Sequence, residues 1–339
     1  MDITVIVPTY KRPDDLRRCL DALKRQTLPA ARVNVVRRDG DSDTAALLAG
    51  YDAGGLAMQV HVVNVPGVVA ALNVGLEQAV GEAVAMTDDD AAPHPDWLER
   101  IAGHFQADAR VGGVGGRDRI FQDNRKDDWP PQARVGISTW YGRVEGNHNC
   151  GVGPAREVEA LKGVCMAFRR RAIGALRFDR RLRGSGAQVA NEALFGGAIR
   201  LAGWTLIYDP AVLVDHYPSV RPDSDQRNQL DRGALRDLIH NATLGHLEYW
   251  PAHRAAAIML HQLLWGSRLS PGVAAAIVYA LRGDRLALYG LREVVMGTLA
   301  GIGTYWHTRR ADVAPRRAVP FLPGARPSSG APPAQRAGS

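Results

Sequence analysis

The feature that most constrains the fold is a regular alternation of two apolar patterns over residues 1–90. Short runs rich in Val, Ile and Ala predict buried strands, and the segments between them repeat their apolar residues at helical spacing. Such alternation predicts a parallel sheet with helices on both faces. The expected strands are 2–10, 32–36, 57–64 and 82–87, and the expected helices are one from Pro13, 44–50 and 68–80.

The rest of the chain is less regular. Residues 118–160 are polar and aromatic, and no regular structure is predicted there. The other expected elements are a helix at 95–107, a strand or tight loop at 111–117, a helix at 190–202 and, at 205–217, a strand, an Asp-Pro turn and a second strand. The pattern turns helical from about residue 226, and the Pro-, Arg- and Ala-rich tail 311–339 is predicted to be disordered.

The apolar stretches of the helical region are short. They cover 255–265, 273–281 and 294–306, each below the roughly 18–20 residues that span a bilayer. Two interpretations follow: a packed helical subdomain, or helices that lie in the membrane interface.

Charge and cysteine content indicate which partners and which cellular compartment to expect. The net charge is +7, but the basic residues are scattered and form no nucleic-acid-binding motif, so no nucleic-acid partner is expected. The three cysteines are widely spaced, which argues against a disulfide framework or a zinc site. The start, MDITVIVPTY, lacks the basic residues and long apolar run of a signal peptide, so a cytoplasmic location is expected.

Three adjacent carboxylates follow the fourth strand, in VAMTDDDAAP. In a parallel sheet, ligands bind at the carboxyl ends of the strands, which places Thr9, Asp39 and Asp88–Asp90 along one edge. A solvated turn would explain the three acids, but carboxylates in this position also suit Mg²⁺ or Mn²⁺ bound together with substrate phosphates. The edge is therefore a candidate cation and phosphate site.

Several stretches together resemble the family 2 glycosyltransferases of the GT-A fold, and the likeness covers roughly residues 2–217. They are VIVPTYKRPDDLRRCLDAL, the Asp39-Gly40 turn, GEAVAMTDDDAAPHPDWL, GVCMAFRR and GWTLIYDPAVLVDHY. The resemblance implies an α/β GT-A fold with a Rossmann-like, mostly parallel sheet. It also implies an inverting enzyme that uses a nucleotide-diphosphate sugar and a divalent cation, Mg²⁺ or Mn²⁺.

The resemblance also implies roles for individual residues. The predicted metal ligands are Asp88, Asp90 of the family's Asp-x-Asp motif, and His216. The predicted nucleotide-sugar-binding residues are Pro8, Thr9, Tyr10, Arg12, Asp39, Asp88 and Asp89, of which Asp89 is expected to matter less than Asp88 and Asp90.

The catalytic base is predicted to be Glu192. The family's base is an Asp that usually follows a Glu, about eleven residues before a strand-opening Gly-aromatic pair; here Asn191-Glu192 precedes Gly203-Trp204. Arg38 stands where many members have Asp. No Q-x-x-R-W segment follows, so a processive synthase is not expected.

The predicted organisation is a nucleotide-sugar-binding half (1–93), an acceptor and catalytic half (94–225), a C-terminal helical region (226–310) and the tail. The expected partners are a nucleotide-diphosphate sugar and a sugar or lipid-linked acceptor of envelope polysaccharide or glycolipid synthesis. Peripheral contact at the inner face of the cell membrane would be made by the C-terminal helices.

Two other functions remain open. A sugar nucleotidyltransferase should carry a Gly-rich basic loop after strand one, but VPTYKRPDD has no glycine. The Asn191-Glu192 pair and Arg38 would also suit a catalytically silent binding protein.

Two minor predictions concern side chains outside the motifs. Packing, rather than stacking on sugar rings, is favoured for Trp129, Trp140 and Tyr141. A solvated basic face, rather than contact with a diphosphate, is favoured for Lys162.

Overall fold

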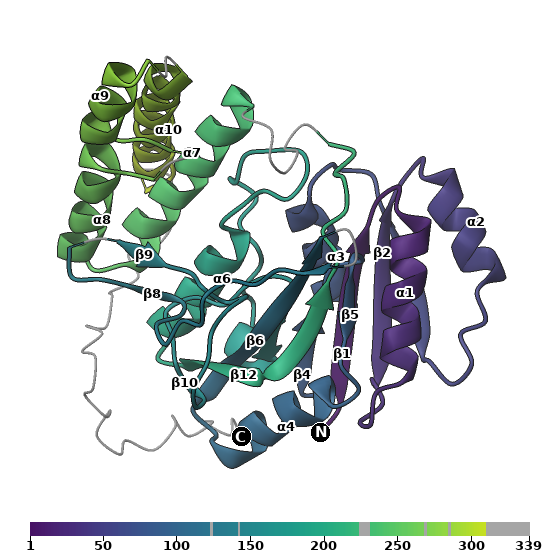
Figure 1. The fold of residues 1–339 in the computed structure, drawn as a ribbon. Helices are drawn as coiled ribbons and strands as arrows, with labels where there is room; N and C mark the ends of the chain where they lie inside the picture. The colour runs from purple at the N-terminus through teal and green to yellow at the C-terminus, as the bar shows by residue number, and fades with distance from the viewer. Residues whose placement is uncertain (123–124, 142, 224–230, 268–269, 284–285, 310–339) are drawn as a thin grey trace.

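The computed structural model describes residues 1–122, 125–141, 143–223, 231–267, 270–283 and 286–309. Figure 1 shows a mixed α/β body with a group of helices at one end. The tail 311–339, predicted to be disordered, lies outside the described residues.

The first part of the chain forms the parallel half of the sheet, as the alternation predicts. Strands β1 (Ile3–Thr9), β2 (Arg32–Arg38), β3 (Met58–Val63) and β4 (Ala83–Met86) lie in the order β4-β1-β2-β3, and all three pairings are parallel. They are joined by α1 (Pro13–Lys24), α2 (Ser42–Gly50) and α3 (Val68–Glu77). Pro13 occupies the first turn of α1, where a missing N–H costs nothing.

Around β1 both faces of the sheet are buried, which explains the unbroken apolar run of this strand. In β1, Val5 and Val7 pack in one core with α1 and α4 (Trp97–Ala107), while Ile6 packs in the other with α3 and α6 (Asn191–Leu201). A strand between two helical layers needs apolar side chains on alternate faces. Each such side chain contributes about 1.5–3 kcal/mol.

The second part of the chain extends the same sheet in the order β10-β12-β6-β11-β4. Strand β12 runs parallel to β6, whereas β11 runs antiparallel to both of its neighbours. These strands are β6 (Val111–Gln122), β10 (Arg156–Glu157), β11 (Met166–Arg169) and β12 (Thr205–His216). The smaller elements are β5 (Ala91–Pro93), β7 (Arg125–Lys126), β8 (Ile137–Ser138), β9 (Val144–Glu145) and α5 (Arg170–Ile173).

The glycine-rich run at 111–117 is a strand and not a loop. A Cβ at Gly113 would come within 2.7 Å of the Leu206 side chain and 2.9 Å of Phe168, and one at Gly116 would come within 1.9 Å of the Val212 carbonyl oxygen. The glycines are therefore needed for close packing inside the sheet. The strand also continues to Gln122, into the stretch for which no regular structure is predicted from sequence.

For residues 205–217 the sequence predicts two strands joined by an Asp-Pro turn. This prediction is wrong in one respect, because β12 is a single strand whose pairing is irregular. Its register against β6 shifts between Asp209 and Leu213. The Asp209 carboxylate accepts a hydrogen bond from the Ala211 N–H at 2.8 Å, which closes a local turn within the strand. Pro210 is tolerated there because a bulged residue donates no ladder hydrogen bond.

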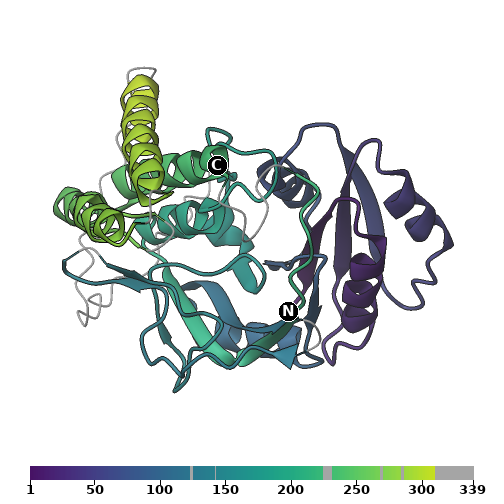
Figure 2. The ribbon, with the colours of Figure 1, turned by 45° about the horizontal axis from the view of Figure 1, so that its top comes forward.

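The C-terminal region is helical, as predicted. It comprises α7 (Arg232–Tyr249), α8 (Ala252–Leu264), α9 (Val273–Leu281) and α10 (Leu286–Arg309). Helices α7 and α10 approach closely, because a Cβ at Gly297 would lie 2.6 Å from the Arg236 carbonyl oxygen. Figures 1 and 2 both show this helical group at the opposite end of the sheet from α1 and α2. None of the helices within the described ranges is long and apolar enough to cross a membrane.

Candidate active site

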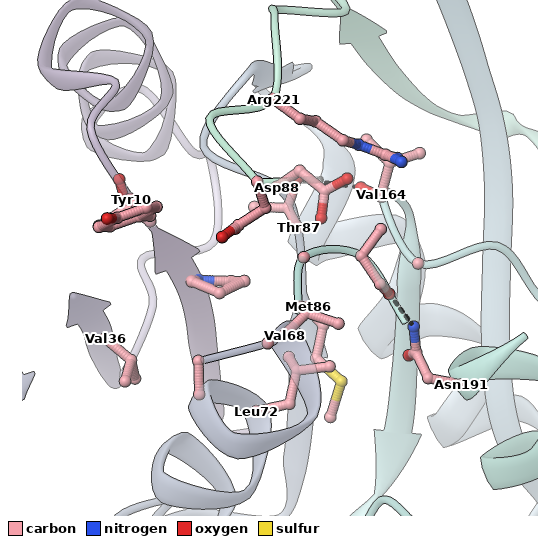
Figure 3. A pocket seen from close by; sticks show the side chains of 18 of the residues that line it. Tyr10, Val36, Val68, Leu72, Met86, Thr87, Asp88, Val164, Asn191 and Arg221 are labelled. Atoms are coloured by element: carbon pink, nitrogen blue, oxygen red, sulfur yellow. Dashed lines mark hydrogen bonds between the residues drawn. The ribbon is translucent and has the colours of Figure 1, made fainter. Parts of the chain in front are cut away.

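A cavity of about 320 Å³ opens at the carboxyl ends of β1 and β4. Its apolar floor comes from β2, α3 and β4, through residues such as Val36, Leu72 and Met86. Figure 3 shows Tyr10 on one side of this cavity, Asn191 on the other and Asp88 between them. Segments far apart in sequence meet here because parallel strands end at one edge of the sheet.

The three acidic residues after β4 have three different surroundings. Asp88 is half-buried and lines the cavity, whereas Asp89 and Asp90 are completely buried. Asp90 accepts a hydrogen bond from the Ser219 N–H at 3.2 Å, and its carbonyl oxygen accepts one from Tyr217. The strand end therefore presents one carboxylate to the cavity and buries two behind it.

Arg12 balances the two buried carboxylates. Its guanidinium lies 2.6 Å from Asp89 and 3.1 Å from Asp90. Burial, opposed by Arg12, raises the pKa of Asp89 to about 7. Arg12 also lines the cavity, whereas Asp89 does not, so the structure brings Asp89 to Arg12 and not to the predicted nucleotide site.

His216, at the end of β12, faces two buried carboxylates. Its Nε2 lies 3.4 Å from Asp90, and its Nδ1 lies 3.5 Å from Asp118 on β6. Lys162 is 2.5 Å from the same Asp118 carboxylate. Burial acts to lower the pKa of His216, but the hydrogen bonds to Asp118 and Asp90 outweigh it and raise the pKa.

Asp88, Asp90 and His216 form a cluster that could hold a cation. One ligand atom from each lies within 4.8 Å of the others. Two carboxylates and an imidazole suit Mn²⁺ well, and carboxylates together with substrate phosphates suit Mg²⁺. The residues therefore fit the divalent cation that the sequence resemblance implies.

The turn into α6 presents Glu192 to the cavity. Gln188 and Ala190 have φ values of +42° and +80°, a conformation that non-glycine residues adopt at a cost. Gln188 holds the turn, since its amide accepts from the Val69 N–H at 3.0 Å and donates to the Leu182 carbonyl oxygen at 3.0 Å. Burial raises the pKa of Glu192, and nearby Asp88 adds to the effect. A carboxylate of raised pKa accepts protons more readily near neutral pH.

The predicted nucleotide-binding residues are only partly brought together. Pro8, Thr9 and Tyr10 line the cavity, but Asp39 is exposed and lies outside it. The neighbouring Arg38 lines the cavity instead, with its guanidinium 4.0 Å from the centre of the Tyr10 ring. Arg38 ends β2 and points into the cavity, whereas Asp39, the next residue, is directed to solvent.

Arg38 also ties the end of β2 to two later segments of the chain. It donates to the Asp223 carboxylate at 3.0 Å and to the Ser185 carbonyl oxygen at 2.9 Å. Asp223 lies in the segment that follows β12, and the same segment brings Arg221 to the cavity (Figure 3).

Sequence reasoning missed Asp118, Asp223 and Arg221, and misjudged Lys162. Lys162 is not on a solvated basic face, because it lines the cavity and pairs with a fully buried carboxylate. The clue to Asp118 in the sequence is its position, since it is a carboxylate that directly follows an apolar, glycine-rich run. The favoured packing of aromatic residues is also wrong for Trp140, which is 87% exposed.

Solved structures establish the fold class. The mannosyltransferase PcManGT from Pyrobaculum calidifontis, solved with GDP-Man and Mn²⁺, has a TM-score of 0.57 at 21% identity, covering 91% of this chain and 87% of that one. S. aureus TarS 1–349, solved with UDP-GlcNAc, has a TM-score of 0.59 at 16% identity, covering 91% and 92%. These likenesses confirm the predicted GT-A fold with its C-terminal helices.

The chain belongs to glycosyl transferase family 2, whose model matches residues 4–176, just over half of the 339 residues. Glycosyltransferase AglE of Haloferax volcanii is 31% identical over 101 residues, or 29% of this chain and 33% of AglE. The pre-mycofactocin glycosyltransferase of Mycobacterium tuberculosis is 33% identical over 107 residues, or 31% of this chain and 21% of that protein. The matched segment thus spans a third or less of these relatives.

Proposed function

We propose that this protein is a metal-dependent, inverting glycosyltransferase that moves a sugar from a nucleotide-diphosphate donor to an acceptor hydroxyl. One observation carries the proposal: Asp88 and His216, which cluster with the buried Asp90, line the same cavity as Glu192. An inverting transfer needs a cation site for the diphosphate and one base for the acceptor.

The proposed reaction is a single displacement at the anomeric carbon. Glu192 takes the proton of the acceptor hydroxyl, whose oxygen forms the new bond to that carbon. The bond from the carbon to the diphosphate oxygen breaks, and its electron pair leaves with the nucleoside diphosphate. A bound Mg²⁺ or Mn²⁺ stabilises the negative charge on the leaving diphosphate. Asp88, Asp90 and His216 would hold this cation, while Pro8, Thr9 and Tyr10 contact the nucleotide.

The loop after β1 favours this reaction over nucleotidyl transfer. Arg12, the basic residue of that loop nearest the acidic cluster, is paired with Asp89 and Asp90. A nucleotidyltransferase would instead need basic groups and glycine N–H groups directed at a triphosphate. Retention of a carboxylate at Glu192 in the cavity argues against a silent binding protein.

The acceptor in this proposal is a sugar or lipid-linked compound of envelope polysaccharide or glycolipid synthesis. Exposed apolar side chains on α9 and α10 support contact with a lipid-bearing acceptor or a membrane surface. They include Ile277, Leu281, Leu299 and Trp306.

A donor panel tests the proposal. With Mn²⁺ present, one nucleotide sugar from a set that includes GDP-mannose and UDP-N-acetylglucosamine should be hydrolysed slowly, and Asp90→Ala should abolish the hydrolysis. Chelation of the metal should have the same effect. No hydrolysis or binding of any donor would contradict the proposal.

A second variant separates binding from chemistry. Glu192→Gln should retain donor binding, measured by calorimetry, but lower transfer about 10²–10⁴-fold, the range typical for loss of a general base. Glu99→Gln, on the exposed side of α4, is the matched control and should transfer normally. Normal turnover in Glu192→Gln would refute the role of Glu192 as the general base.

A further inference from the structure

The turn that presents Glu192 also lines a second, larger cavity of about 720 Å³. Asn191 and Glu192 line the first cavity, whereas the adjoining Ala190, Ala193 and Leu194 line the second. The other walls come from α7, α8 and the start of β9. The two cavities are therefore lined by neighbouring residues of one turn.

The walls of the second cavity are mainly apolar, and several of its polar groups bond to one another. Gln262 donates to the Ser270 carbonyl oxygen at 2.8 Å, and the hydroxyls of Ser267 and Ser270 are 2.8 Å apart. Burial lowers the pKa of His246 to about 4, so its imidazole is neutral. Of the described lining residues, Arg143 alone is an Arg, Lys, Asp or Glu. A cavity of this size and character favours an apolar ligand.

Exposed aromatic rings continue from one wall of this cavity. The ring centre of Tyr141 lies 6.0 Å from that of His261, which lines the cavity. The His261 ring in turn stacks on Trp265, with 6.0 Å between the ring centres. Trp140 contacts Tyr141 at 5.5 Å and is 87% exposed. Such rings offer amphipathic contact area to a ligand that is partly apolar and partly sugar.

We infer that the second cavity binds the apolar aglycone of the acceptor, an alkyl or aryl group attached to the hydroxyl-bearing part. This inference rests on the proposed function. The donor occupies the first cavity, and the acceptor hydroxyl must reach Glu192. The remainder of the acceptor then needs a separate space beside that residue, and the second cavity begins at Ala193, the next residue in the chain.

Binding of alkyl β-D-glucosides to the full chain tests the inference. Hexyl, octyl and decyl glucosides, each below its micelle-forming concentration, should bind with an affinity that rises by up to roughly fourfold per added methylene. Ala242→Trp, which fills the cavity from α7, should weaken octyl glucoside binding at least tenfold. Ala274→Trp, at an exposed position on α9, is the matched control and should bind normally.

Two further variants make the result decisive. If Ala242→Trp does not fold, the smaller Ala242→Leu should still weaken octyl glucoside binding severalfold. Leu281→Ser removes an exposed side chain from α9 and should have no effect if the chain enters the cavity. The inference would be overturned if the affinity for alkyl glucosides did not depend on alkyl length. It would also be overturned if the Ala242 variants bound octyl glucoside as tightly as the unaltered protein. A loss in Leu281→Ser as large as that in Ala242→Trp would overturn it as well.

Donor hydrolysis distinguishes this inference from the proposed function. Ala242→Leu should hydrolyse the donor as the unaltered protein does, because no residue of the donor cavity is changed. If no donor is hydrolysed by any variant while the alkyl glucosides bind as expected, the proposed function fails and the apolar cavity stands as a binding site.

Discussion

The carboxylate of Asp118 controls how His216 is presented. It is fully buried, lies 3.5 Å from His216 Nδ1 and is also paired with Lys162. A carboxylate at Nδ1 orients the ring so that Nε2 faces Asp90 and the candidate cation site. We therefore predict that Asp118 is a positioning residue that acts through His216.

We predict that Asp118→Asn weakens Mn²⁺ binding about 10–100-fold, the usual effect of removing a carboxylate behind a metal-binding histidine. Direct titration of the protein with Mn²⁺ by calorimetry measures this without a substrate. Asp215→Asn is the matched control, because Asp215 precedes His216 in β12 but faces Arg119 at 2.6 Å. Equal Mn²⁺ affinity in Asp118→Asn and Asp215→Asn would contradict the role.

Motif residues close together in sequence could be predicted from their spacing, and Glu192 and His216 from the family resemblance, but the pair of Asp118 and Lys162 could not. Asp88 and Asp90 share one strand end, so their spacing alone suggests a common site. The pairing of Lys162 with Asp118 spans 44 residues and depends on how β6 and β11 lie in the sheet. Asp39 is expected at the site because it follows a strand at the carboxyl edge of the sheet, but Arg38 lines the cavity and Asp39 does not.

At the scale of elements, periodicity predicted the type of most helices and strands but not their irregularities. Strands β1, β2 and β4 are buried on both faces, so their apolar runs are unambiguous. The extension of β6 past Gly116 is polar, and the bulge in β12 contains an Asp-Pro pair that also suits a turn. In both places pairing with neighbouring strands decides the structure, and a single sequence does not contain that information.

Helix α7 carries a histidine that should make stability depend on pH. The folded pKa of His246 is about 4, against an ordinary value of 6.5, because burial disfavours the charged ring. Between these values the unfolded chain binds a proton that the folded chain does not. The free energy of unfolding should therefore fall as the pH is lowered from 6.5 to 4.

We predict that His246→Phe flattens this pH dependence by at most about 1.4 kcal/mol per pH unit. Urea unfolding at several pH values between 4 and 7 measures it. His148 is also buried and its pKa is also lowered, so part of the pH dependence should remain in His246→Phe. His253→Phe at an exposed position is the control, and an identical slope in both variants would contradict the assignment to His246.

For the whole molecule, one continuous sheet joins the two predicted halves of the GT-A region, with β4 paired to both β1 and β11. The division into 1–93, 94–225 and 226–310 stays a prediction. The helical region is packed against the sheet through α6 and α7, and it also exposes apolar side chains on α9 and α10. Packing and contact with an interface are therefore compatible, although sequence reasoning treated them as alternatives.

The exposed side chains of α9 and α10 lead to a prediction about membranes. Leu281 is 83% exposed and Leu299 is 59% exposed, and Arg282, the residue after Leu281, is also exposed. Apolar side chains next to basic ones bind interfaces of anionic lipid. The chain should bind vesicles of phosphatidylcholine and phosphatidylglycerol more tightly than vesicles of phosphatidylcholine alone.

The double variant Leu281→Ser/Leu299→Ser should weaken binding to the anionic vesicles about tenfold or more, because full burial of a leucine contributes about 1.5–3 kcal/mol and half of the lower value from each residue already amounts to tenfold. Vesicle cosedimentation measures the partition coefficient. Val60→Ser/Val62→Ser is the matched control, since both valines are exposed (42% and 49%) on β3, at the other end of the sheet. Loss of binding in both double variants would indicate nonspecific adsorption, and unchanged binding in the leucine variant would exclude this surface as the contact. Truncation after α7 is a poorer test, because α10 packs against α7 through buried side chains such as Val294. Removal of α10 would therefore expose apolar surface of α7.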